Sequence, residues 1–326
     1  MRKIFIFIQT VFFLLSLSLD YDLISAQQRN VSKNVKIVAL MSTAYDEYKE
    51  ALEEALEGFK EALTEANIKF EINLISNVGD NDFNPKTVNE IQTIKPDLIL
   101  SLGSKAFYNI SLHMNDVPVV FSMVLNPNFN NLNNSYNKNI TGITLSIPVI
   151  TQFSIFKEIM PNLQTIGVIY SPEENSELIK EAQEAAEQLN LDLVAADVTN
   201  EREVPKTLNN LIRLVDIIWM IVDRAVNSFE SRKHIILEGF RNDIPVMGLS
   251  EYYVQAGAAF AVSADYKNVG VQSGNMAIKI LNGDKPSQLP YEYPEKVVLY
   301  INERVTDGIG LKVPEKILKE AIIISK

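Results

Sequence analysis

Short apolar runs alternate with amphipathic stretches along most of the chain. Residues 35–41 are short, apolar and rich in β-branched side chains, a pattern typical of a buried strand. Apolar residues spaced three and four apart from Tyr48 to Leu63 then form one stripe on a segment rich in Glu and Lys, which predicts an amphipathic helix. A strand at residues 70–75 and a helix that starts at Asn84-Pro85 come next.

The same alternation continues to the end of the chain. We expect further strands at residues 97–100, 117–121, 165–170, 191–198, 217–222, 244–249, 258–262 and 297–301. Helices are expected between them, including residues 178–189, residues 266–281 and a short last helix that opens at Val313-Pro314-Glu315. Strand–helix alternation predicts right-handed crossovers and parallel sheets with helices on both faces. The asparagine-rich residues 126–139 break the pattern and are expected to form a loop.

Two consecutive series of strands and helices predict two lobes. A chain of about 300 residues also exceeds one typical domain. The predicted fold class is therefore α/β, with two Rossmann-like lobes whose parallel sheets are joined by a multi-strand hinge. We expect lobe 1 to hold residues 35–143 and about 264–296, and lobe 2 to hold residues 144–263 and about 297–326.

The amino-terminal residues resemble a targeting signal rather than part of either lobe. Arg2 and Lys3 precede an apolar run at residues 4–19, and Ala26 offers a small residue for cleavage. This pattern predicts a secretory signal peptide over residues 1–26. The run is shorter than the roughly 20 residues of a membrane-spanning helix. An uncleaved amphipathic anchor is the alternative.

Composition removes several function classes. The formal net charge is −11, whereas nucleic-acid binders need a basic surface, so we expect no nucleic-acid partner. The absence of cysteine excludes disulfides, thiolate metal sites and the lipid-modified cysteine of a lipoprotein. Only His113 and His234 are present, far apart in the sequence, and we expect both on the surface. No metal and no cofactor is predicted.

Small polar residues follow many of the predicted strands. Ligands of open parallel sheets bind beyond the carboxyl ends of the strands, where helix starts present unpaired N–H groups that suit a carboxylate or phosphate. The alternative for each residue is ordinary helix capping. The predicted ligand-binding residues are Ser42, Thr43, Tyr45, Ser104, Ser122, Thr144, Tyr170, Asn175, Ser176, Asp223, Ser250 and Asp265.

Two of these positions carry the most specific chemistry. The Asn175 amide could bind a carboxylate or an amide, although Glu173 and Glu174 beside it would repel an anion. Asp223, at the end of the strand predicted at residues 217–222, could bind an ammonium group, and Arg224 could bind a carboxylate. A surface ion pair is the alternative for both. Tyr252 and Tyr266 could add aromatic walls, as Tyr45 and Tyr170 could, whereas Trp219 is expected in the core.

Many short stretches, in their order and spacing, resemble the ABC transporter substrate-binding family that includes tryptophan- and tyrosine-type binding components. The matching stretches are Thr141-Gly142-Ile143-Thr144 with Pro148, Ile166 to Ser176, Asp216-Ile217-Ile218 with Asp223, Ile244-Pro245-Val246, Gly257-Ala258, Asp265-Tyr266 with Gly270, Gln272, Gly274 and Ala277, Leu281-Asn282-Gly283, Asn302, Gly310 and Pro314-Glu315. Lobe 1 matches through Val38-Ala39 and Pro118-Val119-Val120-Phe121.

The resemblance implies a type I periplasmic-binding-protein fold with the ligand in a cleft between the lobes. In the family the position of Asn175-Ser176 faces that cleft at a helix start. Thr144-Leu145 and Arg224 depart from the family pattern, which usually has Asp soon after the first-hinge glycine and often Asn after the lobe-two Asp. The ligand of a relative is therefore not transferred on residues alone.

The function predicted from the sequence is capture of a small polar molecule for an ABC importer, with an amino acid or an aromatic derivative as the expected ligand class. The expected partners are this ligand and an ABC permease and ATPase complex, and the protein itself is expected to be a periplasmic or otherwise exported monomer. A sensor that reports to a membrane signalling protein is the alternative. An effector core of a transcriptional repressor fits poorly because an export signal replaces the DNA-binding headpiece. An enzyme is not expected, since no Gly-x-Ser-x-Gly elbow or phosphate loop is present.

Overall fold

The computed structural model describes residues 34–42, 46–78, 85–125, 127 and 137–325, and these fall into two compact units. Unit 1 comprises the chain up to Leu145 together with Tyr266–Glu292, and unit 2 comprises Ser146–Asp265 and the chain from Tyr293 onward. The predicted signal peptide at residues 1–26, the candidates Thr43 and Tyr45, and most of the loop at residues 126–139 lie outside the described residues.

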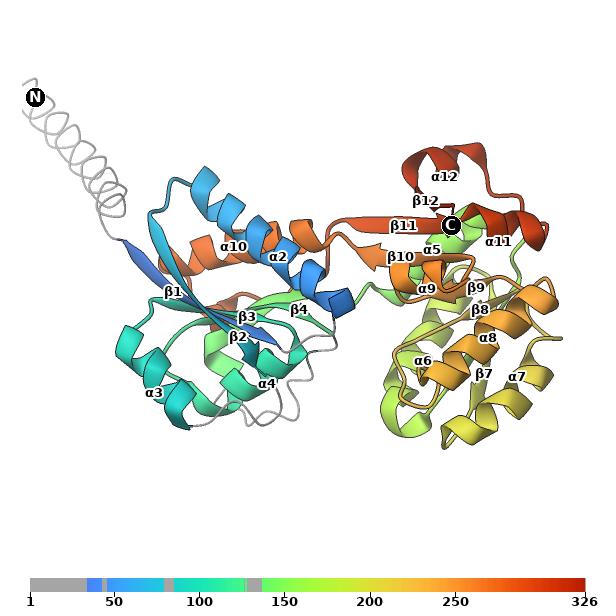
Figure 1. Ribbon diagram of the computed structural model, residues 1–326, viewed down its shortest axis with the longest axis horizontal. Coiled ribbons are helices and arrows are strands. Elements are labelled where there is room, and N and C mark those ends of the chain that lie inside the picture. Colours follow the sequence, from blue (N-terminus) through green and yellow to red (C-terminus); the bar gives the residue numbers. More distant parts are fainter. Residues whose placement is uncertain (1–33, 43–45, 79–84, 126, 128–136, 326) are drawn as a thin grey trace, which may run out of the picture. The chain divides into compact units, whose positions relative to one another are not determined.

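Unit 1 is a parallel five-stranded sheet with the strand order β2-β1-β3-β4-β5. Its elements are β1 (Val35–Ser42), α2 (Asp46–Glu65), β2 (Phe70–Val78), α3 (Pro85–Ile94), β3 (Leu98–Leu102), α4 (Ser104–His113), β4 (Val119–Val124), η2 (Asn137–Asn139), β5 (Ile140–Thr144), α10 (Tyr266–Leu281) and η4 (Pro286–Gln288). Helices α2 and α10 lie side by side on one face of the sheet, and α3 and α4 lie on the other (Figure 1).

Glycines let α2 and α10 approach each other closely. A Cβ atom at Gly270 would lie 2.0 Å from the carbonyl oxygen of Ala55, and one at Gly58 would lie 2.0 Å from that of Lys267. Only glycine fits such a close approach of two helix backbones. The Nζ atom of Lys267 also pairs with Glu61 Oε2 at 2.7 Å. Helix α10 therefore belongs to unit 1 although its sequence lies far from the other unit 1 helices.

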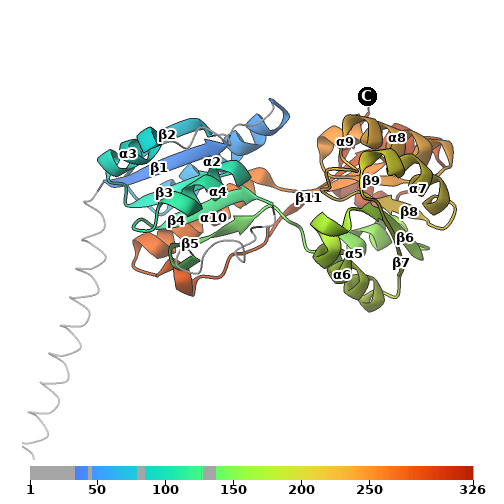
Figure 2. The same ribbon diagram turned by 90° about the horizontal axis from the view of Figure 1, so that it is seen from below.

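Unit 2 is a seven-stranded sheet with the strand order β12-β11-β10-β9-β8-β6-β7. Its elements are α5 (Val149–Ile159), β6 (Thr165–Tyr170), α6 (Pro172–Gln188), β7 (Asp192–Asp197), η3 (Glu201–Glu203), α7 (Val204–Leu211), β8 (Ile217–Trp219), α8 (Phe229–Arg241), β9 (Val246–Gly248), α9 (Glu251–Gln255), β10 (Phe260–Ala264), β11 (Val297–Asn302), α11 (Glu303–Gly308), α12 (Glu315–Glu320) and β12 (Ile322–Ile324). Helices α5 and α6 cover one face of the sheet, and α7 and α8 cover the other (Figure 2).

Aromatic side chains fill the core under α5. The ring of Trp219 packs edge-on against Phe153, with ring centroids 5.0 Å apart, and Phe156 packs against Phe260 at 5.7 Å. Trp219 is 2% exposed, and its indole N–H donates a hydrogen bond to Gln152 Oε1 at 2.9 Å, so the buried donor is satisfied. The prediction that Trp219 belongs to the core is confirmed.

Two details of the predicted sheets are wrong. Strand β11 pairs with β10 in the antiparallel direction, because the chain between them passes through α10 of unit 1 and not through a crossover on the unit 2 sheet. The strand predicted at residues 217–222 ends at Trp219. Beyond it, the carbonyls of Ile221 and Val222 accept hydrogen bonds from side-chain amides rather than from a neighbouring strand.

Candidate functional site

Each sheet has one place where the order of the parallel strands reverses. In unit 1 the chain adds β2 on one side of β1 and β3 on the other, and in unit 2 it adds β7 on one side of β6 and β8 on the other. The helices that follow two such strands lie on opposite faces of the sheet, so a crevice forms at the carboxyl ends of the strands. Ligands of open α/β sheets bind in this crevice. The switch points β1/β3 and β6/β8 are therefore the candidate sites.

In unit 1, Ser42 lies at the switch point between β1 and β3. It ends β1, and its Oγ accepts a hydrogen bond from the backbone N–H of Ala106 in the first turn of α4 at 2.9 Å. The N-cap residue of this helix, Gly103, has φ 86°, and a Cβ there would lie 2.7 Å from Ser42 Oγ. The predicted residue Ser104 follows it and is half-buried. Ser42 thus provides the helix cap that Gly103 lacks.

Next to the switch point, the end of β4 contains a polar group without a partner. Ser122 is fully buried, and its Oγ has no hydrogen-bond partner in the described part of the chain. The register of β4 against β5 shifts after Ser122, where Met123 adopts φ 61°. Thr144, also buried, donates from Oγ1 to the carbonyl of Val124 at 2.9 Å, so this hydroxyl fastens β5 to β4 beyond the bulge.

In unit 2, Asp223 lies at the switch point between β6 and β8 and bonds to residues that follow β6. Its carboxylate is 2% exposed and accepts four hydrogen bonds from within the unit. The backbone N–H of Ser171 and the side-chain amide of Asn175 donate to Oδ2 at 2.6 and 2.9 Å. The backbone N–H groups of Ala225 and Val226 donate to Oδ1 at 2.9 and 3.3 Å. The carboxylate thereby ties the loop after β8 to the start of α6.

The same network orients Asn175. Its Nδ2 donates both to Asp223 and to the carbonyl of Val222 at 3.1 Å, and the residue is 5% exposed. The amide oxygen is the part of the side chain that neither of these two bonds uses. The neighbouring Ser176 is exposed, and its hydroxyl donates to the carbonyl of Pro172. Tyr170, at the end of β6, is half-buried against the core on the α5–α6 face. Ligand contact by these residues stays a prediction.

Arg224 forms a surface ion pair, but its partner is Glu174 and not the adjacent Asp223. Its Nε donates to Glu174 Oε1, and its backbone N–H donates to Glu174 Oε2 at 3.2 Å. The hydrogen bond to Glu174 raises the pKa of the Arg224 guanidinium. The Arg224 side chain is 83% exposed, so this pair lies on the rim of the switch point.

The remaining candidates follow β9 and β10, which are not strands of the switch point. Ser250 precedes α9 and is half-buried, and its hydroxyl does not cap that helix. Asp265 precedes α10 and is half-buried, with its backbone N–H bonded to the carbonyl of Lys296 at 3.0 Å. His113 is exposed, as predicted, whereas His234 is half-buried, because it sits on α8 beside the core residue Ile235.

The sequence interpretation missed Arg232. This residue lies in α8, and its guanidinium carbon is 4.9 Å from the ring centre of Tyr252, 5.2 Å from that of Tyr253 and 5.8 Å from that of Phe229. All are cation–π distances. Both α8 and α9 start at the carboxyl edge of the unit 2 sheet, beside Asp223. The spacing of Phe229 and Arg232, one helical turn apart, was the signal available in the sequence.

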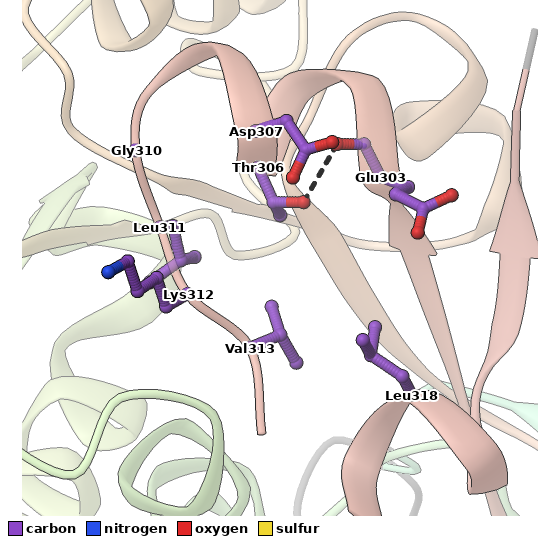
Figure 3. A pocket seen from close by; sticks show the side chains of 8 residues that line it. All are labelled: Glu303, Thr306, Asp307, Gly310, Leu311, Lys312, Val313 and Leu318. Carbon is purple, nitrogen blue, oxygen red and sulfur yellow. Dashed lines mark hydrogen bonds between the residues drawn. The ribbon is translucent and has the colours of Figure 1, made fainter. Parts of the chain in front are cut away.

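Two hollows of unit 2 lie at the opposite edge of the sheet. One, of about 330 Å³, lies between α11 and the start of α12 and is lined by Glu303, Asp307 and Lys312, among others; the hydroxyl of Thr306 donates to the carbonyl of Glu303 inside it (Figure 3). The other, of about 480 Å³, includes Asp216, which directly precedes β8. Both are therefore separate from the switch point.

Within the described ranges, no group of three or more His, Asp or Glu side chains is arranged to hold a metal ion. No helix among these residues is both long enough and apolar enough to span a bilayer.

Comparison with solved structures identifies the fold. A ligand-free, open substrate-binding protein with adhesive properties from Clostridium difficile matches with a TM-score of 0.73 and 23% identity over 90% of this chain and 99% of that one. An ABC domain from Streptococcus pneumonia in complex with L-Trp matches with a TM-score of 0.64 and 24% identity over 90% of this chain and 100% of that one. The predicted type I periplasmic-binding-protein fold with two lobes is confirmed.

Sequence comparison identifies the family. A curated relative, a tyrosine-binding protein of Clostridioides difficile (strain R20291), is 25% identical over 274 residues, which cover 80% of this chain and 78% of the relative. The model of the family described as ABC transporter substrate binding protein matches residues 47–324. The resemblance seen in the sequence is confirmed, and the chain belongs to the ABC transporter substrate-binding protein family.

Proposed function

We propose that this protein is the extracytoplasmic solute-binding component of an ABC importer and that its ligand is an amino acid with an aromatic side chain. The observation that carries the proposal is the pair of switch points, each with polar groups held at the carboxyl ends of its strands. A relative that binds tyrosine and a structural neighbour in complex with L-Trp support this ligand class.

The proposed mechanism is capture by closure. The strand-end edges of both units contact the ligand, and its binding favours the closed arrangement that the permease and ATPase recognise. Ligand can shift this balance only by the difference between its affinities for the open and closed states. The ligand leaves chemically unchanged, because the role of the site is binding and not catalysis. Export through the signal peptide at residues 1–26 places a monomer outside the cytoplasm.

A thermal-shift screen of the exported protein tests the ligand class. The panel consists of aromatic and aliphatic amino acids, purines, sugars and small carboxylates. A ligand at a hundred times its dissociation constant stabilises the folded protein by about 2.7 kcal/mol. We expect L-tyrosine or L-tryptophan to give the largest shift. Stabilisation by a sugar or a purine, with none by any amino acid, contradicts the proposal.

A matched pair of variants then tests the site. Asn175→Ala is expected to abolish the ligand-induced shift, because Asn175 lies at the switch point of unit 2. Asn242→Ala is the control, since Asn242 is an exposed asparagine at the end of α8 whose amide bonds to the carbonyl of Glu238. Equal ligand shifts in both variants argue against this site.

An uptake assay separates import from sensing. Deletion of the gene is expected to remove uptake of the labelled amino acid that the screen identifies. Unchanged uptake by the deletion strain, with tight binding by the purified protein, argues against the importer role and favours the sensor.

A further inference from the structure

We infer that Arg232 in unit 2 binds the carboxylate of the ligand. The inference rests on the proposed function, because it assumes that the ligand is an amino acid, and it names the group that recognises one end of that molecule.

Arg232 differs from the other arginines near the ends of α8. Arg224 pairs with Glu174, and Arg241 pairs with Glu238 at 2.8 Å, and both arginines are exposed. Arg232 is half-buried, and within the described part of the chain no carboxylate pairs with it. Among the described residues, its guanidinium makes one hydrogen bond, from Nη2 to the hydroxyl of Tyr252 at 3.3 Å. Most of the N–H donors of this guanidinium therefore remain available to an anion.

The surrounding rings prepare the guanidinium for this role. Tyr252, Tyr253 and Phe229 hold its carbon within 5.8 Å of their ring centres. Because these contacts already fix the side chain, less rotamer entropy is lost when it binds an anion. A guanidinium that is partly removed from water also attracts a carboxylate more strongly than an exposed one, because the local dielectric constant is lower.

Hydrogen bonds connect this cluster to the switch point of unit 2. The hydroxyl of Tyr253 donates to Asn227 Oδ1 at 3.1 Å, and the backbone N–H of Asn227 donates to the carbonyl of Asp223 at 2.9 Å. Arg232 is thus held in a fixed relation to the loop that carries Asp223. A carboxylate at Arg232 would lie on the same sheet edge as the amide of Asn175.

Exposed apolar side chains on the same edge fit the rest of such a ligand. Val222 is 50% exposed and directly precedes Asp223, and Phe229 is 61% exposed beside Arg232. Exposed apolar groups next to a cation suit a molecule with both a carboxylate and an aromatic ring. Two acidic residues lie nearby: Glu251 accepts a hydrogen bond from Gln255 at 2.8 Å, and Glu230 is exposed on the preceding part of α8.

Paired titrations with L-tyrosine and L-tyrosinamide test the inference, because the amide carries a neutral carboxamide in place of the carboxylate. Isothermal titration calorimetry of the exported protein is the measurement. We expect the unmodified protein to bind tyrosine about 10- to 100-fold more tightly than tyrosinamide, the range expected for hydrogen bonds to a charged group. In Arg232→Gln the affinity for tyrosine falls to that for tyrosinamide, which itself stays unchanged.

Two further variants separate recognition from structure. Arg241→Gln, the same change at the exposed end of α8, is expected to keep the preference for tyrosine. Arg232→Lys keeps the charge and the helix but lacks the planar fork, so we expect part of the preference to remain. Circular dichroism shows whether each variant is folded. If Arg232→Gln does not fold, Arg232→Lys is the test: a reduced preference for tyrosine over tyrosinamide supports the inference, and an unchanged preference overturns it.

The outcomes separate the inference from the proposed function. Equal weakening of tyrosine and tyrosinamide in Arg232→Gln overturns the inference and makes Arg232 a structural clamp for α9. Unchanged tyrosine binding in that variant also overturns it and leaves the proposed function intact. Failure of the unmodified protein to bind any amino acid overturns both.

Discussion

The polar side chains at the switch points of the two units differ in how many hydrogen bonds they make. Among the described residues of the unit 1 edge, Ser42 caps α4 with one hydrogen bond, and the buried Ser122 hydroxyl has no hydrogen-bond partner. In unit 2 a buried carboxylate, Asp223, accepts four hydrogen bonds and joins two loops, and the cation Arg232 lies among aromatic rings on the same edge.

This difference in hydrogen bonding predicts different effects of substitutions on the stability of the two units. A buried carboxylate with a full set of N–H donors holds its surroundings in one arrangement, because breaking the network leaves those donors unsatisfied. The described residues of the unit 1 edge form no comparable network, and the Ser42 and Ser122 hydroxyls do not bond to each other. We therefore expect substitutions at the unit 2 edge to unfold the protein more readily, and substitutions at the unit 1 edge to act locally.

The largest effect is expected from Asp223→Ala. The change removes the acceptor of four hydrogen bonds and leaves buried N–H groups without partners, so we expect a loss of about 3 kcal/mol in the free energy of unfolding. Urea denaturation monitored by circular dichroism is the measurement. A loss no greater than that of the unit 1 variants below would remove the contrast between the two edges.

Ser42→Ala is expected to have a moderate effect. The substitution removes the cap of α4 and leaves the N–H of Ala106 without its acceptor, which costs about 1.5 kcal/mol. Hydrogen exchange should show the change in α4 and not in α6 or α8. Increased exchange throughout unit 2 would mean that the two edges are not independent.

Ser122→Ala is expected to act in the opposite direction. Its hydroxyl is buried without a partner, so its removal should stabilise the protein by about 0.5 kcal/mol. The shift in the midpoint of urea denaturation is the measurement, with Ser42→Ala as the matched serine control. A clear destabilisation would reveal a bonding partner for Ser122 and make the unit 1 edge more like that of unit 2.

Glu174→Gln is expected to have the smallest effect, because its partner Arg224 is exposed. The hydrogen bond from Arg224 to Glu174 raises the pKa of the Arg224 guanidinium above its ordinary value. The ion pair therefore stabilises the fold fully at pH values below the ordinary arginine pKa, and this contribution is lost only as the pH rises through the raised pKa. Both values lie far above neutral pH, so we expect the effect of Glu174→Gln not to depend on pH near neutrality. Salt should remove the difference between the variant and the parent protein at about 1 M, where the Debye length is about 3 Å.

Strand–helix alternation was enough to predict the fold class and the carboxyl edges of the strands. It placed Ser42, Ser104 and Asn175 there, because a strand that ends before a helix has its carboxyl end at the helix start. It could not show which strands are neighbours, and so the two switch points required the structure. The antiparallel pairing of β11 was missed because a periodic pattern contains no strand direction.

The chemistry of the site depended more on tertiary structure. The donors to Asp223 include Ser171 and Asn175, which lie about fifty residues earlier in the sequence. Arg232 was missed because two of its three aromatic neighbours come from α9, and no local pattern joins α8 to α9. Residue type alone can nominate a group for binding, but only its bonding partners show whether the group is already engaged.

The close packing of α10 on α2 has a consequence for biosynthesis. The part of the unit 1 sheet that α10 covers stays exposed until Gly270 and its neighbours leave the ribosome, well after β5 has been made. At typical translation rates that delay is on the order of 10 s. Unit 1 therefore completes its packing only after most of the chain has been synthesised.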